Sequence, residues 1–158
     1  MSDIPAMNSY DAVAGSMAEC YVTIDSERYN MMQLYDFESS LTVSIQDVNI
    51  LGRAGKGKKI TSWSGTWKGT AYYNQSVFRK WLLNFKKNHY VKPFEIQVTV
   101  EDPASSAGRQ TLTHSGCMID SAILAKYSSG DDLLTEDISG TFTDWDMPES
   151  FDMLDGME

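Results

Sequence analysis

Apolar and polar residues alternate along most of this chain, and a period of two is typical of strands that are buried on one side. The alternation predicts strands at residues 19–25, 41–46, 63–71, 94–100, 110–127 and 133–145. Glycine, serine and proline gather between these ranges and predict loops, as at residues 102–108. One segment follows a different period and predicts a helix.

Residues 75–87 carry this helical signal, because their apolar positions recur at helical spacing and share one face. We expect this face to pack on a sheet through Val77, Phe78, Trp81, Leu82 and Phe85. Asn74 is the expected N-cap. We expect the basic side chains of the helix to point outward or toward a neighbour. One helix among about six strands predicts a mainly β fold of the α+β or barrel-like type, rather than an alternating βαβ sheet.

Three of the predicted strands carry short polar side chains on one face. Period two forces these residues opposite Leu41, Val43 and Ile45, or opposite other apolar residues expected in the core. This pattern is typical of the solvent face of a half-buried sheet. Its richness in hydroxyl groups also suits the wall of a water-filled passage, with Lys68 expected beside a carboxylate. The residues are Thr42, Ser44, Gln46, Ser64, Thr66, Lys68, Thr70, Ser139, Thr141 and Thr143.

Residues 51–62 are rich in glycine and lysine and predict a loop. Gly52 and Gly57-Lys58 match the beginning of a phosphate-binding P-loop, but Lys59 stands where that motif has Ser or Thr. A strand rather than a helix is expected to follow, so a nucleotide site is disfavoured. We interpret the segment as a basic loop that suits an acidic surface, through Gly52, Arg53, Lys56, Lys58 and Lys59.

Composition and charge disfavour further classes of function. The 158 residues carry a net charge of −9, which disfavours a protein whose task is to bind phosphates. Ten of the acidic residues lie at or after Asp131, where Lys and Arg are absent. We expect an N-terminal arm at 1–18, one domain at 19–151 and an acidic tail at 152–158. The sequence contains no stretch of about 20 apolar residues and opens without the pattern of a secretory leader, so we expect no membrane binding by the chain itself.

The sequence contains few candidate catalytic or metal-binding residues. His89 and His114 belong to no metal-ligand motif, and no nucleophile motif is present. Asp144 and Asp146 share one side of a predicted strand and are interpreted as a solvated face. Cys20 and Cys117 lie far apart in the sequence and are expected to be reduced. We therefore expect no catalytic residue, no metal ligand and no cofactor.

Several segments together resemble a known family: Val48–Arg53 with the polar loop after it, Gly65–Tyr73, the helix Ser76–Lys87, Phe94–Asp102, Ser105–Arg109 and Gly140–Glu149. In order and spacing they resemble the XkdM-like phage tail tube family, over roughly Glu19 to Phe151. Members of this family build the inner tubes of contractile phage tails and of phage-tail-like bacteriocins.

The resemblance implies a split β-barrel with a flanking helix, similar to the tube protein of type VI secretion. It implies a homo-hexamer whose rings stack into a tube, with a sheath protein around it and baseplate and tail-terminator proteins at its ends. DNA or a tape-measure protein then occupies the lumen, in a virion tail or phage-like particle that is assembled in the host bacterial cytoplasm. In such a tube the polar face is expected to line the lumen, and the basic loop is expected to contact the adjacent ring.

Two other functions stay open at this stage. A small barrel enzyme needs titratable groups that converge in a pocket, which the sequence does not display. A monomeric ligand-binding β-barrel needs no assembly. Self-assembly therefore distinguishes the tube protein from both.

Overall fold

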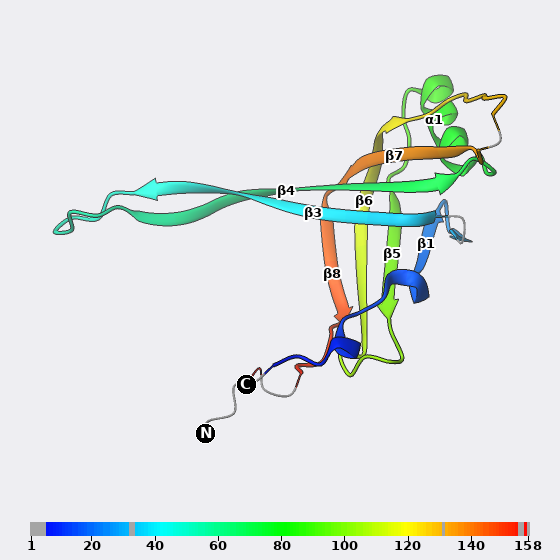
Figure 1. Ribbon diagram of the computed structural model, residues 1–158. Helices are drawn as coiled ribbons and strands as arrows, with labels where there is room; N and C mark the ends of the chain where they lie inside the picture. The colour runs from blue at the N-terminus through cyan, green and yellow to red at the C-terminus, as the bar shows by residue number, and fades with distance from the viewer. Residues whose placement is uncertain (1–5, 32–33, 131, 155–156, 158) are drawn as a thin grey trace. The chain divides into compact units, whose positions relative to one another are not determined.

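The computed structural model spans the whole chain and describes all residues except 1–5, 32–33, 131, 155–156 and 158. Within this part of the chain, strands predominate and one α-helix is present, which confirms the predicted mainly β fold. The elements follow the order η1 (Ser9–Asp11), η2 (Gly15–Met17), β1 (Glu19–Ile24), β2 (Glu27–Asn30), β3 (Leu34–Val48), β4 (Gly57–Tyr72), α1 (Val77–Asn88), β5 (Phe94–Glu101), β6 (Arg109–Ala122), β7 (Thr135–Phe142) and β8 (Asp144–Glu149) (Figure 1).

Hydrogen bonding orders the strands as β2-β1-β5-β6-β7-β4-β3, and β8 also pairs with β6. The chain's contacts divide it into two compact units. The first contains residues 1–32, 92–115 and 145–158, and the second contains residues 33–91 and 116–144. The chain passes between the units within β6, after Ser115. Each unit is described by itself below.

The first unit holds β1, β2, β5, most of β8 and the beginning of β6. Val22 of β1 lies opposite Ile96 of β5, and both side chains are buried, together with Phe94 and Met31. His114 of β6 is buried, and its Nδ1 lies 3.3 Å from the Ile96 carbonyl oxygen. Burial lowers the pKa of this histidine, because desolvation disfavours the charged imidazolium.

The predicted N-terminal arm lies against the loop between β5 and β6. Residues 1–5 of this arm lie outside the described residues. The Asp11 carboxylate accepts hydrogen bonds from the backbone N–H of Ser106 at 3.0 Å and from its hydroxyl at 2.8 Å, and these bonds lower the pKa of Asp11. In the predicted acidic tail, residues 155–156 and 158 are outside the described part, and the N–H of Asp152 donates to the Ala107 carbonyl at 2.6 Å. Both chain ends therefore contact the same loop.

The second unit is built on β3, β4, β7 and the end of β6, with α1 over part of one face. Trp67 of β4 is at the centre of its core, only 4% exposed. Its ring lies 6.2 Å from the rings of Phe37 and of Phe78 on α1. Gly140 on β7 makes room for this ring, because a Cβ there would come within 2.8 Å of the indole and 1.9 Å of the Met118 carbonyl oxygen. The aromatic core therefore depends on a glycine in the neighbouring strand.

The helix prediction is confirmed in type but needs three corrections. Helix α1 begins at Val77 after Ser76, and the Gln75 side chain, rather than Asn74, accepts the Val77 N–H at 2.8 Å. Among the predicted packing residues, Phe78 and Trp81 are buried, and Val77 and Leu82 are half-buried. Phe85 is 51% exposed, contrary to prediction, because it lies in the last turn of the helix, which ends at Asn88. Arg79 does not point outward, as described below. None of the described helices is long and apolar enough to cross a membrane.

Strand boundaries also differ from the prediction. β3 begins at Leu34, ahead of the predicted residue 41, and β4 begins at Gly57, inside the predicted loop 51–62. Lys58 and Lys59 therefore belong to a strand, because the hairpin ladder continues to the pair Val48 and Gly57. The predicted last strand is interrupted at Thr143, which lies between β7 and β8. Cys20 and Cys117 are free thiols in β1 and β6, and burial raises the pKa of Cys20 to about 12.

Candidate assembly surfaces

The polar residues predicted to share a face do so on β3, β4 and β7. Directly opposite residues of antiparallel strands lie on the same face. Thr42 lies opposite Ser64, and Thr66 lies opposite Thr141. Ser44 and Gln46 continue the face on β3, and Lys68, Thr70 and Ser139 continue it on β4 and β7. Thr143 lies past the end of β7, so the strand register does not place it on this face. All ten side chains are exposed or half-buried.

This polar face also carries carboxylates that the sequence analysis did not single out. Glu38 lies opposite Lys68, with 3.8 Å between its Oε2 and the lysine Nζ, and is the carboxylate expected beside that lysine. Both side chains are mostly exposed, so this ion pair contributes little to stability. Asp137 accepts from Thr70 at 3.0 Å, and Asp120 accepts from Ser139 at 2.7 Å. Glu38 shares the period of Thr42, and Asp137 shares the period of Ser139, so alternation alone could have placed these two carboxylates on this face.

Within the described part of the chain, no third strand pairs with the outer half of the β3–β4 hairpin. β7 pairs with residues 65–72 of β4, whereas residues 57–64 are paired with β3, and this half extends beyond β7 (Figure 1). On the face opposite the polar set, five large apolar side chains are between 40% and 61% exposed: Leu41, Val43, Ile45, Ile60 and Trp63. We call these five residues the apolar stripe. Leu41, Val43 and Ile45 were predicted to be core; the face is correct, but the chain provides nothing among its described residues that buries them.

The tip of the hairpin is a shorter loop than predicted. Residues 49–56 connect the strands, with Gly52 at φ +87°, a conformation that favours glycine, and with Leu51 fully exposed. Arg53 and Lys56 lie in this loop and are exposed. Lys58 forms an ion pair with Asp47 across the strands, and Lys59 lies opposite Gln46. The predicted basic set therefore divides into two loop cations and two strand cations.

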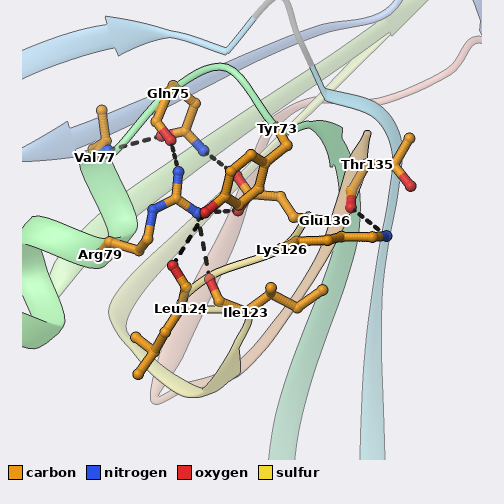
Figure 2. Close-up of polar contacts among 9 residues, drawn as sticks. All are labelled: Tyr73, Gln75, Val77, Arg79, Ile123, Leu124, Lys126, Thr135 and Glu136. Carbon is orange, nitrogen blue, oxygen red and sulfur yellow. Dashed lines mark hydrogen bonds and ion pairs between the residues drawn. The ribbon is translucent and has the colours of Figure 1, made fainter. Parts of the chain in front are cut away.

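A buried polar cluster fixes α1 and the β6–β7 loop to β7 (Figure 2). Glu136 of β7 is 2% exposed and forms an ion pair with Arg79 of α1, and Gln75 Nε2 donates to Glu136 at 2.7 Å. Arg79 also donates to the Ile123 carbonyl at 3.3 Å and to the Gln75 carbonyl, and its guanidinium lies 4.5 Å from the centre of the Tyr73 ring. The cluster positions a helix and a loop.

Two further donors hold the same loop. The Tyr73 hydroxyl donates to the Leu124 carbonyl at 3.2 Å, and Lys126 Nζ donates to the Thr135 carbonyl at 2.8 Å (Figure 2). The sequence pattern already indicates the buried carboxylate of this cluster. Glu136 shares the period of Ile138, Gly140 and Phe142, so alternation already places a carboxylate on the apolar face.

Residues 5–149 match the sequence model of a family described as "Phage tail tube protein". A curated relative, "Phage-like element PBSX protein XkdM" of Bacillus subtilis (strain 168), is 28% identical over 144 residues, which are 91% of this chain and 95% of the relative. Among solved structures, a chain of the "PVC sheath-tube complex in extended state" has a TM-score of 0.64 at 10% identity, covering 92% of this chain and 99% of that one. The SPP1 tail tube structure has a TM-score of 0.58 at 13% identity, and the match covers 89% of this chain and 81% of that one.

Proposed function

Because the chain belongs to the phage tail tube protein family, we propose that copies of it form homo-hexameric rings through the apolar stripe and line a channel with the polar face. The chain is a structural protein of a tail tube, as predicted from its sequence. The family and the structural neighbours are structural tube proteins, and the alternatives of a small enzyme or a monomeric ligand-binding barrel have no support from them.

One observation carries the assignment of the two faces. The same hairpin exposes five large apolar side chains on one face and short polar side chains on the other. Exposed apolar patches of this kind mark protein–protein contacts, since their burial is favourable. A neighbouring copy that covers the apolar stripe leaves the polar face in contact with water, as the wall of a channel requires.

The polar face also suits passage of an anionic cargo. Besides hydroxyl groups and carboxylates, the predicted polar set contains one lysine, Lys68, which lies beside Glu38; the register adds Lys59, opposite Gln46, toward the hairpin tip. A row of unpaired cations would instead hold DNA by counterion release. We propose that DNA or a tape-measure protein occupies this channel, and that Arg53 and Lys56 at the hairpin tip contact the adjacent ring.

The other partners follow from the same assignment. Solved neighbours include tubes inside a sheath, at a baseplate and at a terminator, which supports tube stacking for this chain. We propose a sheath protein around this tube, and baseplate and tail-terminator proteins at its ends. The site of action is then a virion tail or phage-like particle that is assembled in the host bacterial cytoplasm, and no cofactor takes part.

Removal of the apolar stripe tests ring assembly. Leu41→Ser, Val43→Ser and Ile45→Ser together are expected to abolish rings and tubes in electron micrographs and sedimentation, because each serine removes the apolar area that association buries. The matched control is Thr42→Ala with Ser44→Ala, on the same strand but on the opposite face, and it should assemble like the wild type. Tubes of normal appearance from the triple variant would contradict the assignment of this stripe to a contact between copies.

Two arginines on the polar face test the channel. Thr66 and Thr141 lie opposite one another, so Thr66→Arg with Thr141→Arg adds two adjacent cations for each copy in a ring. Assembly should persist, and retention of a short labelled DNA by purified tubes should rise more than about tenfold at low salt and fall steeply as salt is added. Thr66→Gln with Thr141→Gln is the uncharged control. Equal DNA retention by the arginine and glutamine tubes would place this face away from the channel.

A further inference from the structure

Opposite charges are separated into two segments of this chain. Residues 74–94 contain five basic residues and no Asp or Glu, whereas residues 127–158 contain ten acidic residues and no Lys or Arg. The first segment includes α1, and the second includes β7 and β8. Of the ten acidic residues, Glu136 is paired with Arg79 and Glu149 with Arg109. Asp146 and Asp152 are exposed and take part in none of the ion pairs found among the described residues.

One side of α1 is exposed and basic. A helix turns about 100° per residue, so Lys80, Leu83 and Lys87 lie within one narrow sector, away from the buried Phe78 and Trp81. All three side chains are exposed, and Leu83 is 47% exposed. The ion pairs found among the described residues involve neither Lys80 nor Lys87. We call these three residues the basic face.

The acidic segment has an exposed surface of matching character. All six residues of β8 are exposed, and the chain that follows keeps Asp152 exposed as well. Asp146 of β8 and Asp152 after it both expose a carboxylate, and their negative charge complements the charge of Lys80 and Lys87. We call Asp146 and Asp152 the acidic patch.

We propose that the basic face of one copy binds the acidic patch of the next copy around the ring. The two surfaces differ, so the contact is heterologous, and a heterologous contact repeats from copy to copy and closes a ring when its rotation allows. Opposite potentials also raise the rate at which copies meet and select the correct register. This inference rests on the proposed function, because it names the residues that join neighbours in a tail tube ring, and it adds a contact separate from the apolar stripe.

Charge reversal on either surface tests the contact. Lys80→Glu with Lys87→Glu, or Asp146→Lys with Asp152→Lys, is expected to raise the protein concentration needed for half-maximal ring formation about tenfold at low salt. The effect should shrink as salt shortens the range of the interaction. A variant that carries all four reversals restores opposite charges and should assemble within about threefold of the wild type. Lys80→Arg with Lys87→Arg keeps the charge and serves as the matched control, and circular dichroism verifies that each variant is folded.

Cross-linking identifies the chains that make the contact. A carbodiimide joins lysine and carboxylate side chains that touch, and rings formed from equal amounts of 15N-labelled and unlabelled protein distinguish links between copies from links within one copy. We expect mixed-isotope peptides that connect Lys80 or Lys87 to Asp146 or Asp152.

Three results would overturn the proposal. The variant Lys80→Glu with Lys87→Glu could form rings at the same protein concentration as the wild type, the variant with all four reversals could fail to regain ring formation, or cross-links could be found only within one chain. Normal rings that have lost binding to a sheath protein would assign the basic face to that partner instead. A wild-type chain that forms no rings at all would overturn the proposed function together with this contact, whereas the other outcomes leave the tube assignment intact.

Discussion

Trp67→Ala is expected to lower the free energy of unfolding by about 4 kcal/mol. The indole is almost fully buried between Phe37 and Phe78, and its Nε1–H donates to the Thr141 carbonyl at 3.3 Å. Alanine leaves a cavity that the surrounding strands can fill only in part, because Gly140 provides no side chain to occupy it. Urea denaturation, followed by circular dichroism below the concentration at which copies assemble, measures the loss.

Trp63 provides a matched control for this substitution. It lies on the same strand and the same face, four residues before Trp67, but it is 42% exposed in the apolar stripe. Trp63→Ala should cost less than about 1.5 kcal/mol in the single chain, because little of its area is buried there. It should nevertheless impair ring formation strongly. Equal losses of stability in the two variants would show that the outer hairpin is part of the core.

Arg79→Ala is expected to lower the free energy of unfolding by about 3–5 kcal/mol, because it leaves the Glu136 carboxylate buried without its cation. The same change removes the donor to the Ile123 carbonyl, so amide hydrogen exchange should quicken at residues 123–126. Urea denaturation and hydrogen exchange measured by mass spectrometry report these two effects separately.

The double variant Arg79→Met with Glu136→Leu separates the ion pair from packing. It replaces both charges by apolar groups of similar volume, which is often close to neutral for a buried pair. Its stability should return to within about 2 kcal/mol of the wild type, while exchange at residues 123–126 stays fast. A double variant as unstable as Arg79→Ala would show that the guanidinium acts mainly through Tyr73 and the carbonyl groups.

The sequence by itself determined the identity of most elements and the orientation of their side chains. Period two placed Thr66 and Trp67 on opposite faces of β4, and helical spacing placed Phe78 and Trp81 on the side that α1 buries. These are local properties, because φ and ψ of each strand or helix fix the directions of successive side chains. The order and spacing of the segments also sufficed to identify the family.

Only the tertiary structure decided which of these faces are covered. Val43 and Trp67 obey the same alternation, yet Val43 is exposed because β7 pairs with β4 only from residue 65 onward. Phe85 follows the helical stripe but remains half exposed at the end of α1. Coverage depends on the lengths of neighbouring elements, which a local period does not contain. The tertiary structure also decides the Arg79–Glu136 ion pair. Its members are 57 residues apart in the sequence, and the pairing of β4 with β7 and the packing of α1 bring them together.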